Sequence, residues 1–245
     1  MDDVAVAASA ARAAAGALLT LRADGGLTGR VLGDAGDAAA QEAISAVLAA
    51  ERPGDAVLSE EAADDARRLT ADRVWIVDPL DGTREYGEAG RSDWAVHVAL
   101  WTDGELGASA VALPALDQVL VTEPAPAPPA RSDGRVRIAV SRTRPPAEAD
   151  AVAAALHAEL VPMGSAGYKV LAVVRGEVDA YVHAGGMYQW DSAAPVAVAR
   201  AAGLSTTRID GAPLVYNAAG LSLPDLVVCR PELAEPILAA VRAGR

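Results

Sequence analysis

The sequence predicts a layered α/β sandwich, in which helices cover the faces of sheets, for a chain of 245 residues. Three observations lead to this prediction. The first half has helix-type stretches followed by several strand-type runs that turns separate. The second half alternates strand-type and helix-type stretches. A chain of this length can also bury a substantial core without disulfides, because the buried share of the surface rises with chain length.

The first half is expected to begin with two helices. An Ala-rich stretch over residues 2–22 runs into Asp24-Gly-Gly, a glycine stop signal. A second helix is expected over residues 38–50, with Asp37 as its N-cap residue. Strands are then expected over residues 56–59, 74–77, 92–100, 106–113 and 118–121. We expect the last three to form an antiparallel meander in the same sheet as 74–77.

A stretch rich in proline, residues 123–129, is the best candidate for an internal boundary, because consecutive prolines stiffen the chain. It separates an N-terminal half, residues 1–128, from a C-terminal half, residues 129–245. In the second half, strands are expected over 136–140, 161–163, 178–183 and 226–229, and helices over 146–160, 166–175, 189–202 and 231–242. We interpret the two halves as parts of one compact unit.

Composition excludes several partners. A formal net charge of −12 disfavours nucleic acid and anionic membranes, because an acidic surface cannot neutralise either. No run of 18 uninterrupted apolar residues occurs, and no basic region precedes the first apolar run, so we expect a cytoplasmic protein. The single cysteine, Cys229, excludes an intramolecular disulfide. The oligomeric state stays open, with a homodimer as one candidate.

The chemistry is expected at the turn Asp78-Pro-Leu-Asp81-Gly-Thr83, which follows a buried strand. Proline biases the preceding residue toward an extended conformation, so the two carboxylates can converge. Mg²⁺ takes about six oxygen ligands and keeps several for water and phosphate. The backbone N–H groups of Gly82 and Thr83 can hold a phosphate beside it. Taken alone, the turn is equally compatible with two solvated carboxylates in an ordinary Asx turn.

Two positions in the second half stand out. Of 21 cationic residues only Lys169 is a lysine, which indicates that this position needs a compact ammonium group to bind a phosphate. A single lysine retained by chance is the alternative explanation. Asp191 opens the helix expected over 189–202, where one carboxylate oxygen can cap the helix while the other faces a metal.

His97 and His183 lie in strand-type runs and are expected to be core residues without a role.

Three segments resemble, in order and spacing, the signature motifs of the inositol-monophosphatase-like, lithium-sensitive, Mg²⁺-dependent phosphatases. They are Ser59-Glu60-Glu61, Asp78-Pro-Leu-Asp81-Gly-Thr83 and Trp190-Asp191-Ser-Ala-Ala. Two further segments, Arg84-Glu-Tyr86 and Gly164-Ser165-Ala-Gly-Tyr-Lys169, resemble the CysQ-type 3′,5′-bisphosphate nucleotidase branch. The resemblance extends from about residue 2 to residue 242.

The resemblance implies a five-layered αβαβα sandwich of the inositol monophosphatase and fructose-1,6-bisphosphatase type. It implies two or three Mg²⁺ ions, with ligands from Glu60, Asp78, Asp81, Asp191 and the carbonyl of Leu80. Thr83 is implied to orient and help deprotonate the attacking water, with Asp37 as its acidic partner. The chain departs from the family at Asp34, where Thr or Ser is usual. The implied substrate contacts are Gly82, Thr83, Ser165, Lys169 and Asp191.

We therefore expect a phosphoric monoester hydrolase that removes the 3′-phosphate of adenosine 3′,5′-bisphosphate, and of its sulfated form, in connection with sulfate assimilation. A two-ion site can activate water, neutralise the phosphate and stabilise the leaving alkoxide. An inositol or fructose phosphate phosphatase with the same site is the nearest alternative. Enzymes that form an aspartyl phosphate need Asp-x-Asp, whereas Asp78 and Asp81 are three residues apart. A non-catalytic acidic metal-binding domain is the alternative from another class.

Overall fold

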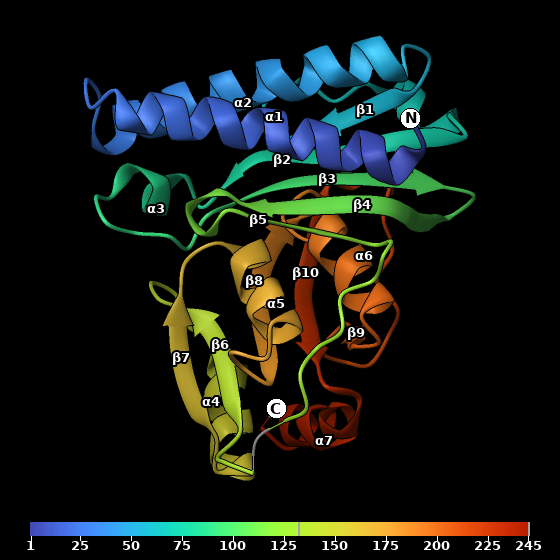
Figure 1. Ribbon diagram of the computed structural model, residues 1–245. Coiled ribbons are helices and arrows are strands. Elements are labelled where there is room, and N and C mark those ends of the chain that lie inside the picture. The colour runs from blue at the N-terminus through green and yellow to red at the C-terminus, as the bar shows by residue number, and fades with distance from the viewer. Residues whose placement is uncertain (132, 245) are drawn as a thin grey trace.

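The computed structural model describes residues 1–131 and 133–244, which form five stacked layers (Figure 1). A pair of helices covers the first sheet, a second pair lies between the two sheets, and a third pair covers the far face of the second sheet. The pairs are α1 (Asp3–Ala23) with α2 (Gly29–Glu51), α5 (Ala166–Val174) with α6 (Ala193–Ala201), and α4 (Ala147–Leu156) with α7 (Ala234–Ala243). The predicted αβαβα fold class is confirmed.

The first sheet has the strand order β1-β2-β3-β4-β5. Its strands are β1 (Ala56–Ser59), β2 (Arg73–Asp81), β3 (Ala95–Thr102), β4 (Glu105–Leu113) and β5 (Gln118–Val121). β1 pairs in parallel with β2, and every later pair is antiparallel, so the predicted meander is confirmed. β2 extends four residues beyond the predicted end at residue 77, with a shift in its pairing to β3 between Asp78 and Asp81.

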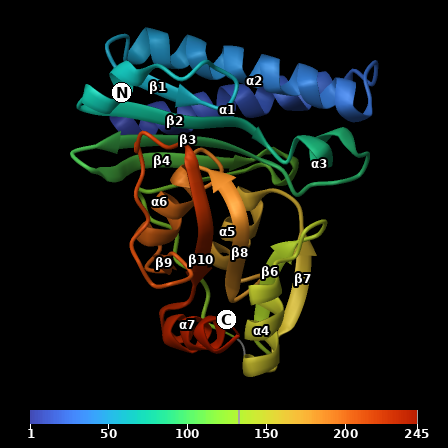
Figure 2. The same cartoon turned by 180° about the vertical axis from the view of Figure 1, so that it is seen from behind.

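The second sheet has the strand order β7-β6-β8-β10-β9 (Figure 2). Its strands are β6 (Arg137–Ser141), β7 (Glu159–Met163), β8 (Ala180–Tyr188), β9 (Ser205–Thr207) and β10 (Ser222–Cys229). Four of them were predicted, whereas the three-residue edge strand β9 was not. Four short helices complete the described chain: α3 (Thr83–Gly87), η1 (Ala66–Thr70), η2 (Pro114–Leu116) and η3 (Pro231–Leu233).

The central core joins the two sheets. One cluster of buried residues combines Ile76 of β2 and Val111 of β4 with Val173 of α5, Val196 of α6 and Tyr181 of β8. The segment between β5 and β6 contains the boundary predicted at residue 128, and that division of the chain stays a prediction. Because the cluster of buried residues includes side chains from both sheets, the core is continuous from the first half of the chain to the second.

One described helix, α1, is long and apolar enough to cross a membrane by length and composition alone, with a mean hydropathy of 1.6. Core helices can have the same properties. Its buried residues Val6, Ala10, Ala14 and Leu18 recur every four positions, and they belong to the cluster under β3 and β4. The apolar side of α1 is therefore covered by the sheet and by α2.

The start of α2 was predicted wrongly. The helix begins at Gly29, with Thr28 at the N-cap position, so Asp37 lies inside the helix and does not cap it. Glycines disfavour helix in isolation, which made residues 29–37 resemble a turn. Here two of them are required, because a Cβ on Gly33 would lie 2.6 Å from the methyl of Thr83 and one on Gly36 would lie 2.7 Å from the Tyr86 ring.

Candidate active site

The acidic turn lies at the end of β2, where the pairing with β3 is irregular. Asp78 and Leu80 are buried, and Asp78 Oδ1 accepts a hydrogen bond from the Leu80 N–H at 3.1 Å. Asp78 Oδ2 is buried with no hydrogen-bond partner among the described residues. Gly82 then turns the chain with φ 91°, a conformation that other residues rarely adopt. The turn therefore holds one buried carboxylate oxygen without a hydrogen bond at the C-terminal end of β2, 3.8 Å from His97 Nδ1.

Glu60, Asp78 and Asp191 meet beside this turn. One carboxylate oxygen from each lies within 4.8 Å of the others. β1 and β2 are parallel neighbours with Ser59 opposite Val77, so Glu60 and Asp78 emerge at the same sheet edge. Asp191 comes from the other half, between β8 and α6. The structure thus brings together three of the four predicted carboxylates.

The electrostatics of the cluster indicate that a cation belongs there. Loss of solvation, followed by repulsion from Asp81, raises the pKa of Glu60 and of Asp191 to about 7. The same two causes, with Glu60 and Asp191 adding to the repulsion, hold the pKa of Asp78 well above its usual range. Crowded carboxylates, one with a buried oxygen that accepts no hydrogen bond, match the hard oxygen ligands that Mg²⁺ and similar divalent ions prefer. The residues present therefore fit a divalent cation.

Asp81 points toward the start of α5. Its Oδ2 accepts hydrogen bonds from the Ser165 hydroxyl and the Gly167 N–H, both at 2.6 Å, and its Oδ1 accepts one from the Ala166 N–H at 3.1 Å. Asp81 in the first half of the chain therefore accepts hydrogen bonds from the first two N–H groups of a helix in the second half, whose N-cap residue is Ser165. It also forms a second possible metal-binding group with Asp78 and His97.

His97 is a functional candidate that the sequence reasoning missed. It is fully buried, as predicted, but its Nε2 lies 3.3 Å from Asp81 Oδ2 and its Nδ1 lies 3.1 Å from the Trp190 carbonyl oxygen. Burial lowers the pKa of His97, opposed by the charge of Asp81. The pairing of β3 with β2 places His97 opposite Asp78. That register is the signal that could have revealed it, because directly paired residues lie side by side.

Thr83 and Asp37 come together as predicted. The Thr83 hydroxyl donates to the Leu80 carbonyl at 3.1 Å and lies 3.5 Å from Asp37 Oδ1. Loss of solvation, with repulsion from Glu61 and then Asp34, raises the pKa of Asp37 to about 7. Asp37 reaches Thr83 from the side of α2, where Gly33 allows the close approach.

The predicted cap of α6 is wrong, whereas the predicted contact of Lys169 with a phosphate stays a prediction. Asp191 does not cap α6, whose N-cap position is Ser192; its Oδ2 accepts from the Tyr188 N–H at 2.7 Å instead. Lys169 is buried, and its ammonium donates to the carbonyl oxygens of Gly164 and Ser165 and lies 5.1 Å from the centre of the Tyr181 ring. Burial lowers the pKa of Lys169 to about 8. The polar groups of Lys169 and Ser165 thus already have partners inside the protein.

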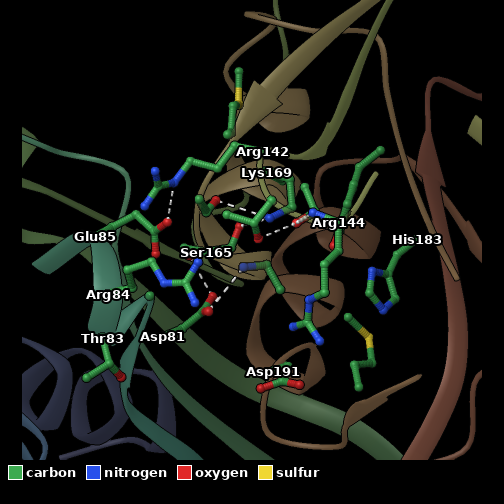
Figure 3. A pocket seen from close by; sticks show the side chains of 18 of the residues that line it. Asp81, Thr83, Arg84, Glu85, Arg142, Arg144, Ser165, Lys169, His183 and Asp191 are labelled. Atoms are coloured by element: carbon green, nitrogen blue, oxygen red, sulfur yellow. Dashed lines mark hydrogen bonds and ion pairs between the residues drawn. The ribbon is translucent and has the colours of Figure 1, made fainter. Parts of the chain in front are cut away.

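A cavity of about 320 Å³ adjoins these residues (Figure 3). Asp81 and Asp191 line one side, and the guanidinium groups of Arg84 and Arg144 extend toward it from other segments. Arg142, also at the cavity, is held by Glu85 at 2.6 Å and by Glu88. No ion pair joins Arg84 or Arg144 to another described residue. The cavity therefore combines a cation site with free positive charge for an anion.

A carboxylate cluster for divalent cations beside a cationic cavity, in a five-layered sandwich, defines a metal-dependent phosphatase. Residues 1–244 match the inositol monophosphatase family, and the chain belongs to it. The resemblance drawn from the three motifs is confirmed.

Curated relatives from several mycobacteria carry the name 3′-phosphoadenosine 5′-phosphate phosphatase. The one from Mycobacterium tuberculosis is 53% identical over 218 residues, which cover 86% of this chain and 82% of the relative. The one from Mycobacterium leprae is 49% identical over 255 residues, covering 99% and 94%. Among solved structures, CysQ from Bacteroides thetaiotaomicron matches with a TM-score of 0.80 and 27% identity, over 93% of this chain and 96% of that one.

Proposed function

We propose that this protein hydrolyses the 3′-phosphate of adenosine 3′,5′-bisphosphate to AMP and phosphate, and that it acts in the same way on 3′-phosphoadenylyl sulfate. The observation that carries the proposal is the meeting of Glu60, Asp78 and Asp191 beside a cavity with two unpaired guanidinium groups. The names and the extent of similarity of the mycobacterial relatives support the choice of substrate.

Glu60, Asp78, Asp81, Asp191 and the Leu80 carbonyl are proposed to hold two or three Mg²⁺ ions. Bound Mg²⁺ supplies charge neutralisation at the phosphate oxygens and acidifies water. Thr83 orients the attacking water, because its hydroxyl is fixed between the Leu80 carbonyl and Asp37. Asp37 accepts the proton that this hydroxyl relays. The N–H groups of Gly82 and Thr83 hold the phosphate.

The second phosphate of the substrate needs positive charge away from the carboxylates. Ser165 and Lys169 were predicted to supply it, yet their hydroxyl and ammonium groups bind Asp81 and two backbone carbonyls. We propose that they hold the cavity wall in place and that Arg144 contacts the 5′-phosphate, with Arg84 as a further cation. Arg144 extends into the cavity and stands exposed without an ion-pair partner among the described residues.

A comparison of substrates tests the proposal. Purified protein with Mg²⁺ should hydrolyse adenosine 3′,5′-bisphosphate with a far higher kcat/KM than inositol 1-phosphate or fructose 1,6-bisphosphate. The reverse order would assign the protein to the inositol or fructose phosphatases that share this site. Complete inactivity on all three would favour the non-catalytic metal-binding alternative.

The Arg144 contact has its own test. Arg144→Met should raise KM for the bisphosphate about tenfold, the effect expected for one lost hydrogen bond to a charged group. It should leave KM for adenosine 3′-monophosphate unchanged, since that compound lacks the 5′-phosphate. Arg12→Met, a change on helix α1, is the control. Equal effects on both nucleotides would exclude a 5′-phosphate contact.

The cellular setting is part of the proposal. We infer a cytoplasmic enzyme that removes a by-product of sulfate assimilation and is inhibited by lithium. Lithium titration of the Mg²⁺-dependent activity tests the last point. Sedimentation measurements decide between a monomer and a homodimer.

A further inference from the structure

The carboxylates of Glu60 and Asp191 lie on segments that no strand pairing joins. Glu60 begins the loop that leads from β1 to η1, whereas Asp191 follows β8 of the other sheet. Their separation in the acidic cluster therefore depends on contacts between the sheets, of which the 3.1 Å contact of His97 Nδ1 with the Trp190 carbonyl is one. A third segment, residues 216–221, lies between these two segments and binds both.

Arg68 of η1 connects the Glu60 loop to this third segment. Its side chain is fully buried, which is unusual for a charged residue. Nη1 donates to the Asn217 side-chain oxygen at 2.8 Å and to the Ala218 carbonyl at 3.0 Å, and Asn217 Nδ2 donates back to the Arg68 carbonyl at 3.1 Å. Asp64, within the Glu60 loop, balances the charge at 2.6 Å. Arg68 therefore fixes its own loop and the third segment together.

Gln189 makes the matching connection from the Asp191 side. It is 1% exposed, and its Nε2 donates to the Ala218 carbonyl at 3.2 Å and to the Gly220 carbonyl at 2.7 Å. Its backbone N–H donates to the Leu221 carbonyl at 2.9 Å, and its own carbonyl accepts from Ala193 at the start of α6. Gln189 stands two residues before Asp191, so its position determines where that carboxylate lies.

The Ala218 carbonyl oxygen is the shared point, because it accepts hydrogen bonds from both Arg68 and Gln189. We propose that Arg68 and Gln189 are positioning residues that fix Glu60 relative to Asp191 through this carbonyl and thereby set the affinity of the cluster for a divalent cation. Neither side chain is assigned a contact with the cation or the substrate. The inference rests on the proposed function only in that the cluster binds such a cation. Groups that orient metal ligands from outside typically change metal affinity about 10- to 100-fold when removed.

The test compares two adjacent arginines. Arg68→Met removes the connection, and Arg67→Met is the matched control, because Arg67 belongs to the same short helix but has a side chain that is 90% exposed and pairs with Asp65. Mg²⁺ affinity is measured by calorimetry without substrate, and hydrogen exchange is measured on the metal-free protein. We expect Arg68→Met to weaken Mg²⁺ binding about 10- to 100-fold and Arg67→Met to leave it unchanged. Arg68→Lys should recover part of the affinity.

Hydrogen exchange separates positioning from general destabilisation. Arg68→Met should accelerate exchange in residues 189–193 as well as in 60–72, while exchange in α1 stays at the wild-type rate. Gln189→Met should weaken Mg²⁺ binding to a similar extent, and the double variant should be no weaker than either single one, since both act through the same carbonyl. If Arg68→Met does not fold, Gln189→Met decides the question by the same two measurements.

Wild-type Mg²⁺ affinity for Arg68→Met, or for Gln189→Met, would overturn the inference, as would additive effects in the double variant. The proposed function is judged separately, by wild-type activity on the bisphosphate. A wild-type protein that binds Mg²⁺ in an Arg68-dependent way without hydrolysing the bisphosphate would contradict the proposed function and leave this inference standing.

Discussion

The contact between α2 and Thr83 can be tested with one methyl group. Gly33 is buried within α2, and a Cβ at this position would lie 2.6 Å from Thr83 Cγ2 and 3.3 Å from the Thr83 carbonyl oxygen. Ordinary contacts of a Cβ begin at 3.4 Å, so Gly33→Ala must open this contact by about 0.8 Å. Rotation of the Thr83 side chain cannot relieve it without cost, because the hydroxyl shares its Cβ and would leave the Leu80 carbonyl.

Gly33→Ala should therefore separate activity from stability. A displacement of about 1 Å at a reacting group can cost about 100-fold in rate, and we expect a loss of that order in kcat. The free energy of unfolding should fall by no more than about 2 kcal/mol, since the gain of about 1 kcal/mol from alanine in a helix partly offsets an overpacking cost of about 1–3 kcal/mol. The assays are phosphate release for kcat and KM and urea unfolding for stability.

A control and a rescue make this experiment decisive. Gly16→Ala places the same methyl on the exposed side of α1 with nothing within 4 Å, so it should stabilise the protein and leave kcat unchanged. The double variant Gly33→Ala/Thr83→Ser lacks the obstructed methyl but keeps the hydroxyl, and it should regain most of the lost activity. A kcat for Gly33→Ala within a few fold of wild type would refute the reasoning that the Thr83 position controls the reaction.

Three other predictions follow from contacts described above. Asp191→Asn should lower kcat by more than about 100-fold, which is the upper end of the effect of groups that only orient ligands. The same variant should have a higher melting temperature in EDTA, because one repelling charge is removed. A lower melting temperature would contradict the crowding of the three carboxylates. Gly167→Ala should destabilise the protein by about 1–3 kcal/mol in urea unfolding, since its Cβ would overlap His97 Nε2; unchanged stability would mean that α5 and β3 are not packed as described. Burial raises the pKa of the Cys229 thiol to about 12, so at pH 8 a thiol reagent should modify it only after unfolding, and stoichiometric labelling of the native protein would be the contrary result.

Local patterns predicted much of the fold and part of the site. The runs of apolar residues in β2 and β4 indicate strands without any knowledge of their neighbours. Glu60 and Asp78 converge because the residues that precede them, Ser59 and Val77, are paired in two parallel strands. What the sequence could not provide was the direction of each carboxylate at the end of its strand. Asp81 lies close to Asp78 in the chain, yet its hydrogen bonds go to α5 in the other half.

Contacts distant in sequence explain the errors. Gly33 and Gly36 resembled breaks in a helix because their role is to admit Thr83 and Tyr86, about fifty residues later. His97 resembled an ordinary core residue because its relation to Asp78 depends on strand register. The buried charge of Arg68 gave no signal at all, since its partners are Asp64 nearby and Asn217 far along the chain. Local propensity carries none of this information.

The hydrogen bonds that Asp81 accepts from the start of α5 have a consequence for how the protein can be assembled. The first turn of α5 depends on a carboxylate that an isolated C-terminal half would lack, so that half on its own would begin a buried helix with unsatisfied N–H groups. Synthesis from the N-terminus delivers this carboxylate before the helix that needs it. A chimera that takes one half of the chain from a related protein must therefore keep a β2 turn and an α5 that fit each other. The two segments have to come from the same parent protein.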